Sequence, residues 1–368
     1  MSEKTFAPGP QNADPQRLLS TRGSFLNWSP EEERYWFFSA IDGLDRFRQL
    51  VWRHRLDCDF SEVARSGSGL PIYGFRLGRG AKQVVILSGM HGCEPSGPRG
   101  MLAYLDALMN GEERFGVRLD RARILDTITL HVFPFINPGG AQRLSLHFPD
   151  SWHGTWIPEW TPVNKERFFS EANEPNHFFY GTYVKKAPMR FTVEQIAEWE
   201  KTGNLLGSSI TDQGLDMWFD WDDTHGVQTK ALKEIIGSIR PFCVADFHNF
   251  MYPTEVFAPT AFSKGDLAKE ENALALALQA EWRARGLPYN QRAPRPYPKP
   301  PEKDYEDYWF HQLGARTLIV EFNGGMLATE GAEYDPKTHQ RALTRHESLA
   351  SVFFAARALV DHLAENAG

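Results

Sequence analysis

Four short apolar segments constrain the fold of this chain more than any other feature of its sequence. They are Val84 to Leu87, Ile128 to Ile136, Cys243 to Phe247 and Thr317 to Phe322, and turn residues or charged residues bound each of them. Apolar runs of this length without alternating polar residues are typical of strands buried on both faces, as in a parallel sheet. The sequence therefore predicts a largely parallel sheet at the centre of the molecule.

Segments with helical periodicity lie between these strands and after the last one. They are residues 101–109, 229–239, 272–285 and 348–365. Another helix is predicted from Pro30 to Val51, because Ser29 is a suitable N-cap and three glutamates follow Pro30 in the first turn. Alternating strands and helices predict an α/β fold, a single domain whose central mixed, largely parallel sheet is flanked by helices.

Two segments depart from this alternation. Residues 1–23 are rich in Pro, Gly, Ser, Asn and Gln, and predict a loose N-terminal arm before a domain at 24–368. Residues from about 145 to 223 are dense in Trp, Phe, Tyr, Asn and Pro, and predict a large insertion. A loop of that length is uncommon unless it packs on the domain, so we expect it to lie over the active-site face as part of a binding cleft.

The composition excludes several classes of partner. The formal net charge is −7, with 40 Lys and Arg against 47 Asp and Glu, so the chain has no surplus of cations for binding nucleic acid. No apolar run approaches the ~20 residues that span a bilayer, and the first residues lack the apolar part of a secretory signal. We therefore expect a cytoplasmic protein without a nucleic acid or membrane partner. The three widely spaced cysteines exclude a disulfide framework and a four-cysteine zinc site.

Polar side chains stand at the ends of the predicted strands. His91 and Glu94 follow the first strand, Asn137 follows the second, His248 follows the third, and Glu321 lies in the fourth. In open α/β sheets, ligands bind at the carboxyl ends of the strands. We therefore expect these side chains to converge on one site.

Three of these residues have the chemistry of a catalytic zinc site. Two histidines and one carboxylate, here His91, His248 and Glu94, form a three-ligand set that leaves a fourth position for water. Zinc lowers the pKa of that water to roughly 7, and a free carboxylate, for which Glu321 is the candidate, can accept its proton. A histidine at a strand end is often an ordinary polar residue, but polar groups at all four strand ends favour the metal site. The chain has no HExxH, P-loop or GxSxG motif.

Together these motifs resemble those of the M14 zinc carboxypeptidases, whose relatives include the aspartoacylase and succinylglutamate desuccinylase group. The H-G-x-E motif of the family is similar to residues 91–94, its N-P-D-G turn to residues 137–140, its D-x-H motif to residues 246–248, and its last strand glutamate to Glu321. Order and spacing agree from about residue 70 to residue 360.

The resemblance implies a carboxypeptidase-like fold and one zinc ion per chain, bound by His91, Glu94 and His248. It also implies that Glu321 is the general base and acid of a metallo-carboxypeptidase-like hydrolase. The expected reaction is hydrolysis of an amide bond by a zinc-bound water.

One motif of the family is only partly present. The family normally has a G-x-D-x-N-R segment, and the best counterpart is Gly214 to Phe219, in which Asp216 would orient His91. The Asn-Arg pair that holds the terminal carboxylate of the substrate is replaced by Trp218 and Phe219, which would favour an apolar group. A competing alignment places Asn164-Lys165 at that position.

Other site residues follow from the same resemblance. Arg143 lies where family members often carry an arginine that stabilises the oxyanion. It could have that role or replace the missing anchor for the substrate carboxylate, and the alternative is a surface arginine that caps a loop. Tyr297, in a proline-rich segment, is the candidate for the mobile tyrosine of the family, with Tyr305 and Tyr308 as alternatives. Asn137 is assigned to the substrate-binding residues.

Three functions are compatible with these residues. The first is a zinc-dependent peptide hydrolase of the carboxypeptidase type with an atypical substrate. The second is a deacylase that cleaves an N-acyl amino acid or an isopeptide in a small molecule or biosynthetic intermediate. The third is a binding protein without catalysis on the same scaffold, which would not need the complete ligand set or Glu321. The expected partner is a peptide or a small substrate similar to an N-acyl amino acid.

Overall fold

A computed structural model describes residues 29–37, 39–54, 58–92, 94–147, 211–212, 217–222, 224–248, 254–296, 306–322 and 343–366, with only the backbone of 143–147 and 219. The predicted arm at 1–23 and most of the predicted insertion at 145–223 lie outside these residues, so both stay predictions. No helix in the described part of the chain is long and apolar enough to cross a membrane.

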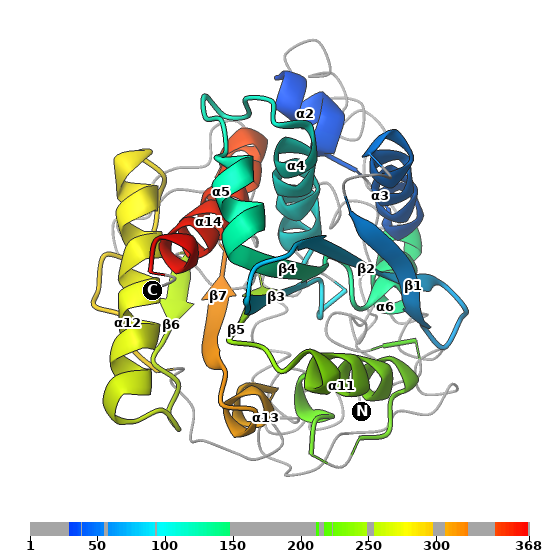
Figure 1. The fold of residues 1–368 in the computed structure, drawn as a ribbon. Helices are drawn as coiled ribbons and strands as arrows, with labels where there is room; N and C mark the ends of the chain where they lie inside the picture. The colour runs from blue at the N-terminus through cyan, green and yellow to red at the C-terminus, as the bar shows by residue number, and fades with distance from the viewer. Residues whose placement is uncertain are drawn as a thin grey trace, which may run out of the picture.

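Seven strands form one sheet. Their bounds are β1 Asp59–Arg65, β2 Pro71–Gly78, β3 Lys82–Ser88, β4 Ile128–Phe133, β5 Cys243–His248, β6 Glu255–Phe257 and β7 Arg316–Glu321. They lie in the order β1-β2-β4-β3-β5-β7-β6 (Figure 1). Strand β3 pairs in parallel with β4 and β5, and β5 pairs in parallel with β7, while the other three pairings are antiparallel. The predicted α/β fold with a mixed sheet and a parallel centre is confirmed.

The four apolar segments form the centre of this sheet, and the sequence did not predict the outer strands. Strand β1, with the sequence DFSEVAR, has no buried residue, and β6 is only three residues long. Neither strand contains a long apolar run. Strand β1 lies at an edge of the sheet and exposes much of its surface, and β6 is too short to leave a pattern in the sequence.

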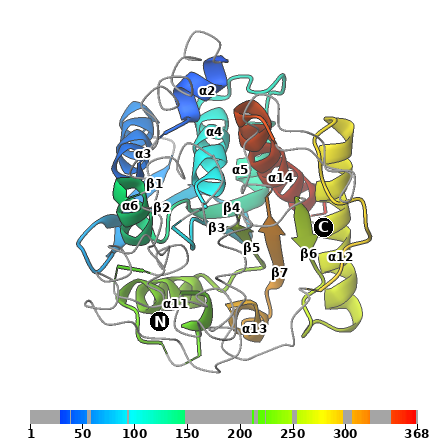
Figure 2. The ribbon, with the colours of Figure 1, turned by 180° about the vertical axis from the view of Figure 1, so that it is seen from behind.

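Helices cover both faces of the sheet. Their bounds are α2 Pro30–Tyr35, α3 Ala40–His54, α4 Ser96–Asn110, α5 Arg121–Thr127, α6 Pro138–His147, α11 Val227–Ile239, α12 Gly265–Ala284, α13 Glu306–Gln312 and α14 Arg345–Glu365, with a 3-10 turn η5 at Met217–Phe219. Figures 1 and 2 show α2, α3, α4, α5 and α14 on one side of the sheet, and α11 with α13 on the other.

The predicted helix from Pro30 to Val51 is wrong in one respect, because the chain forms two helices there. Helix α2 ends at Tyr35, and Trp36 has an extended backbone. The buried guanidinium of Arg99 lies 3.8 Å from the centroid of the Trp36 ring and donates hydrogen bonds to the carbonyl oxygen of Phe37. This carbonyl is therefore bound by a side chain from α4 rather than by the helix ladder.

The sheet separates two apolar clusters. Successive strand residues point to opposite faces, so Val84 and Ile86 of β3 join one cluster with α3, α4, α12 and α14. Val85 and Leu87 join the other cluster with η5, α11 and α13. We call these the α4 side and the α11 side of the sheet.

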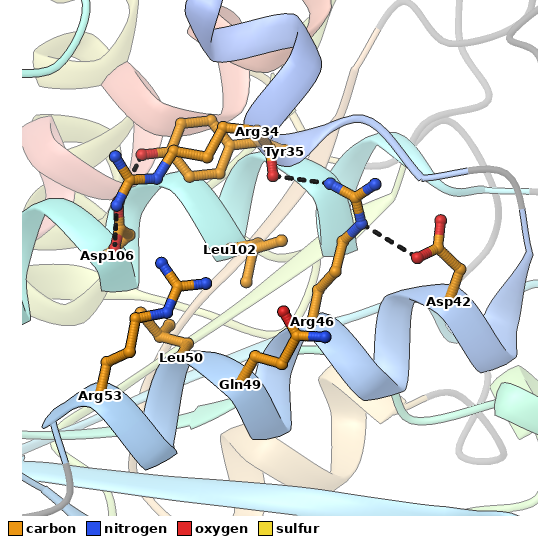
Figure 3. Close-up of a pocket in the computed structure, with 9 residues that line it drawn as sticks. All are labelled: Arg34, Tyr35, Asp42, Arg46, Gln49, Leu50, Arg53, Leu102 and Asp106. Atoms are coloured by element: carbon orange, nitrogen blue, oxygen red, sulfur yellow. Dashed lines mark hydrogen bonds and ion pairs between the residues drawn. The ribbon is translucent and has the colours of Figure 1, made fainter.

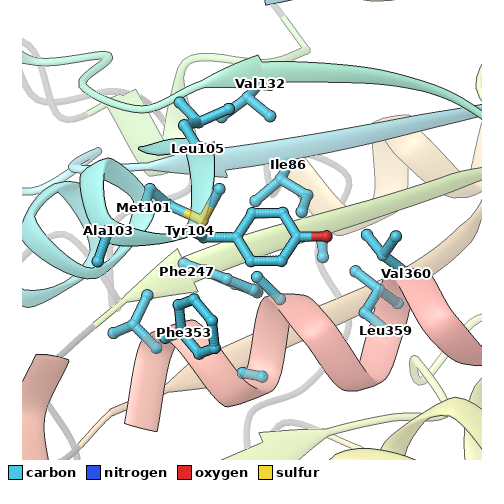
Figure 4. Packing of buried hydrophobic residues seen from close by; sticks show 14 of the residues in the cluster. Ile86, Met101, Ala103, Tyr104, Leu105, Val132, Phe247, Phe353, Leu359 and Val360 are labelled. Carbon is cyan, nitrogen blue, oxygen red and sulfur yellow. The ribbon is translucent and has the colours of Figure 1, made fainter. Parts of the chain in front are cut away.

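On the α4 side, helices α4 and α14 pack closely against each other and against the sheet (Figure 4). Tyr104 and Phe353 meet edge to face with ring centroids 5.9 Å apart, and both are fully buried. A Cβ atom added to Gly100 would lie 2.2 Å from Cβ of Val352, so only glycine fits where the helices are closest. This tight layer supports the strands that carry the polar residues.

Candidate metal centre

The centre forms where β3 and β5 end side by side on the sheet. His91 and Glu94 belong to the turn between β3 and α4, which the Glu94 N–H closes by donating to the His91 carbonyl oxygen at 3.0 Å. A Cβ atom on Gly92 would lie 2.6 Å from backbone atoms of Gly140 and Ala141, so the turn needs glycine to approach the start of α6. His248 is the last residue of β5. The pairing of β3 with β5 thus brings the two parts of the site together.

The three predicted ligands form a compact group. Glu94 Oε1 lies 2.7 Å from His91 Nδ1, Glu94 Oε2 lies 3.0 Å from His248 Nδ1, and the two Nδ1 atoms are 3.4 Å apart. A tetrahedral zinc ion with bonds of about 2.0–2.1 Å keeps its ligand atoms about 3.3 Å apart. The donor set fits zinc, and its atoms, 2.7–3.4 Å apart, lie at about this separation or somewhat inside it. All three side chains are at most 3% exposed.

The electrostatics of the group keep its acid ionised. Burial alone would raise the pKa of Glu94, but the neighbouring charges of His91 and His248 lower it to about 2. Burial lowers the pKa of His248, but the negative charges of Asp246 and Glu94 raise it well above its usual range. Glu94 is therefore a carboxylate, which is the form that binds a metal ion.

Two further acidic residues contact the far side of His248. Asp246 Oδ2 lies 3.0 Å from His248 Nε2, and Glu306 Oε1 of helix α13 lies 3.5 Å from the same atom. Both acids are buried, and Glu306 is fully so. Burial and the charge of Asp246 raise the pKa of Glu306 well above its usual range. Nδ1 of His248 thus faces Glu94 and His91, while Nε2 faces carboxyl groups, as is typical of metal-binding histidines.

The sequence reasoning did not identify a role for either acid. Asp246 belongs to the D-x-H motif at 246–248, and its position two residues before His248 places it on the same face of β5, which was the available signal. Glu306 comes from a short helix that is distant in sequence. No local pattern marks it.

Glu321 lies beside the ligands on the neighbouring strand. It is the last residue of β7, is 2% exposed, and pairs in register with His248. The Phe322 N–H donates to the His248 carbonyl oxygen at 2.8 Å, which fixes this register at the site. Paired residues of adjacent strands share one face and lie ~4.8 Å apart. The carboxyl group predicted as the base is therefore on the same face of the sheet as His248.

An aromatic residue packs against both histidines. Trp218 of η5 is 4% exposed, and its ring centroid lies 5.7 Å from that of His91 and 5.9 Å from that of His248. The α11 side of the sheet thus gives the centre an apolar boundary. Trp218 is one of the predicted substrate-binding residues, and its contact with a substrate stays a prediction.

Asn137 connects the centre to α6. Its side-chain amide donates to the Met90 carbonyl oxygen at 2.9 Å, and its side-chain oxygen accepts from the Gly140 N–H at 3.0 Å. The residue is fully buried. These bonds hold the turn that carries His91, and the predicted contact of Asn137 with substrate stays a prediction.

The remaining predicted residues are described in part or not at all. Arg143 lies on α6 and Phe219 lies on η5, each with its backbone only. Tyr308 lies on α13, with its ring centroid 4.9 Å from that of Phe262. Outside the described residues lie Asp216, Tyr297, Tyr305 and the Asn164-Lys165 pair.

A family model and solved structures resemble this chain. The model Peptidase_M14, described as zinc carboxypeptidase, matches residues 49–174, which include the turn with His91 and Glu94. No curated protein has a sequence that matches the chain significantly.

Three solved structures illustrate the likeness of fold. A metallo-carboxypeptidase from Burkholderia cenocepacia has a TM-score of 0.55 and 14% identity, over 86% of this chain and 68% of that one. Thrombin activatable fibrinolysis inhibitor has a TM-score of 0.56 and 13% identity, over 94% and 79%. A metallo-carboxypeptidase from Pseudomonas aeruginosa, in complex with (2-guanidinoethylmercapto)succinic acid, has a TM-score of 0.52 and 13% identity, over 87% and 69%. At such identities the likeness shows the fold.

Proposed function

We propose that this chain is a zinc hydrolase of the M14 carboxypeptidase family, whose model matches residues 49–174, and that it hydrolyses an amide bond of a peptide or N-acyl amino acid with an atypical specificity. The observation that supports this most is the buried group of His91, Glu94 and His248, with donor atoms 2.7–3.4 Å apart. The family uses one zinc ion, and this group fits it.

His91, Glu94 and His248 would hold the zinc ion. When bound, zinc supplies a Lewis acid that polarises the substrate carbonyl and lowers the pKa of a bound water. Glu321 accepts the proton of the attacking water and passes it to the leaving amine. Its register with His248 and its burial support this role. Arg143 stabilises the negative charge that develops on the carbonyl oxygen, and Tyr297 contacts the substrate.

Asp246 and Glu306 orient the imidazole of His248. Asp246 accepts a hydrogen bond from Nε2 of His248, which leaves Nδ1 of His248 available to the metal ion. Glu306 lies against the same edge of the ring. Asp216 has the corresponding role for His91.

Substrate specificity depends on Trp218 and Phe219, which replace the Asn-Arg pair that binds the substrate carboxylate in the family. Trp218 packs against both ligand histidines and is an apolar residue at the centre. Phe219 is the second apolar residue that the sequence has in place of the Asn-Arg pair. This position therefore favours a substrate with an apolar or aromatic group. It does not favour a substrate whose carboxylate needs two parallel hydrogen bonds from an arginine. This arrangement favours a narrow substrate range, and it leaves the deacylase reaction as the second candidate function.

Metal analysis combined with activity tests the proposal. Zinc content and hydrolysis of a panel of peptides and N-acyl amino acids are measured for the wild type, His248→Ala and Glu321→Gln, with His362→Ala on α14 as the matched control. We expect zinc in the wild type, the control and Glu321→Gln, its loss in His248→Ala, and hydrolysis only in the wild type and the control. The substrates that are cleaved distinguish a carboxypeptidase from a deacylase. A wild type that binds no zinc after reconstitution, or a Glu321→Gln variant with full activity, would contradict the mechanism.

A further inference from the structure

A polar cavity lies on the α4 side of the sheet, opposite the metal centre. It has a volume of about 360 Å³ and lies between helices α2, α3 and α4 (Figure 3). Leu50 and Leu102 lie at its base and belong to the apolar cluster of that side. Asp106, another residue at the cavity, is near the C-terminal end of α4, so about 15 Å of helix separate it from the turn with Glu94. The cavity is therefore distinct from the metal centre.

Three guanidinium groups face this cavity, and two carboxylates balance them only in part. Arg34 Nη2 lies 3.2 Å from Asp106 Oδ2, and Arg46 Nε lies 3.1 Å from Asp42 Oδ1. Arg53, about two turns further along α3, makes no ion pair or hydrogen bond within the described part of the chain. The lining residues thus carry an excess of positive charge, and Arg53 is the lining arginine without an ion pair among the described residues.

The acid beside Arg34 is already shared. Asp106 is 1% exposed, and it accepts hydrogen bonds from the Tyr35 hydroxyl, from Asn110 at 2.6 Å and from Arg114 at 2.9 Å. Its charge is therefore divided between two arginines. Arg34, with 40% of its side chain exposed, remains able to bind an anion from the solvent side.

A neighbouring cavity extends the site along α3. It has a volume of about 440 Å³ and shares Gln49 and Arg53 with the first cavity. Trp52 lines it, and this indole is 86% exposed. Arg48 lies one turn before Trp52 on the same helix face. An exposed tryptophan between arginines provides a flat apolar surface next to positive charge.

We propose that these two cavities form a binding site for a small organic anion, whose phosphate or carboxylate group is held by Arg34, Arg46 and Arg53 and whose planar part lies on Trp52. Guanidinium groups bind both kinds of oxyanion through paired, charge-assisted hydrogen bonds. Binding places the anion beside Arg53, whose guanidinium pairs with no carboxylate of the described residues. The site needs no metal ion, so it does not depend on the proposed hydrolase activity.

Calorimetric titration tests this proposal on the full chain, with its zinc content measured in parallel. The probes are inorganic phosphate, succinate and phenyl phosphate, each compared with sodium chloride at the same ionic strength. We expect phosphate or succinate to bind to the wild type. Arg53→Ala should weaken that binding by about 10- to 100-fold, the effect of losing a charge-assisted hydrogen bond. Because Arg53 has no hydrogen bond or ion pair with the described residues that its removal would break, we expect this variant to keep its thermal stability.

Two comparisons complete the experiment. Arg79→Ala removes a side-chain guanidinium that is 83% exposed and remote from α3, so it should leave binding unchanged. Trp52→Ala should remove the extra affinity for phenyl phosphate over phosphate and leave phosphate binding intact. Binding of phosphate but not succinate, or the reverse, assigns the anionic group. The proposal is overturned if neither anion binds beyond the sodium chloride control, or if Arg53→Ala binds as tightly as the wild type.

Discussion

Asp307 provides a quantitative test of how burial controls stability next to the metal centre. It is on helix α13, directly after Glu306, and only 8% of the residue is exposed. Burial raises the pKa of its carboxyl group to about 7, with a further increase from the charge of Glu271 and a partial offset from the Tyr308 N–H, which donates to Asp307 Oδ1 at 2.8 Å. Asp307→Asn keeps an oxygen for that N–H and removes the ionisation.

The sign of the effect follows from the direction of the shift. A carboxyl group with a raised pKa in the folded protein binds its proton more tightly there than in the unfolded chain. Its contribution to stability is therefore fully present below about pH 3.8 and is lost as the pH rises to about 7. At 1.36 kcal/mol per pKa unit, the whole shift corresponds to ~4 kcal/mol, of which about 3 kcal/mol is lost between about pH 5 and pH 8.

Urea unfolding of the wild type and Asp307→Asn at these two pH values measures this loss. The variant should gain about 3 kcal/mol in free energy of unfolding relative to the wild type as the pH rises from about 5 to about 8. Asp266→Asn is the matched control, because the Asp266 side chain is 87% exposed. It should show no comparable change. A difference between Asp307→Asn and the wild type that is the same at both pH values would refute the reasoning.

Three further predictions concern packing and metal binding. Gly100→Ala gains ~1 kcal/mol in helix propensity but places a Cβ atom 2.2 Å from Val352, so thermal unfolding should show a net loss of about 1–2 kcal/mol, reversed in part by Val352→Ala. Trp282→Ala removes a fully buried indole that donates to the Ser351 carbonyl oxygen at 2.9 Å, and chemical denaturation should show a loss of about 3–5 kcal/mol. Glu306→Ala should weaken zinc binding about 10- to 100-fold in a chelator competition. Glu306→Gln keeps a hydrogen-bonding group at His248 and should retain most of the affinity. Equal zinc affinities of Glu306→Ala and the wild type would contradict the positioning role.

The centre of the fold could be predicted because burial on two faces leaves a pattern in the sequence. Strands β3, β4, β5 and β7 are covered by helices on both sides, so their apolar runs are continuous. The break between α2 and α3 could not be predicted in this way. It depends on Arg99, a residue of α4 whose guanidinium binds the Phe37 carbonyl oxygen, and no local pattern near Phe37 encodes that contact.

The candidate site shows the same division. His91, Glu94, His248 and Glu321 stand at strand ends, where the predicted sheet already implies their convergence. The contact of Glu306 with His248 depends on how α13 packs against β7, which is a tertiary arrangement without a periodic signal in the sequence.

The pairing of β3 with β5 also determines when during folding a metal ion can bind. His248 is 157 residues from His91 and 154 from Glu94, and only the paired ends of the two strands bring them together. Contacts between such distant residues close a long loop and form slowly. Zinc therefore meets its full ligand set only after the central strands have paired. Binding that is confined to the native state stabilises it by mass action and slows unfolding, but it does not speed the steps that precede pairing.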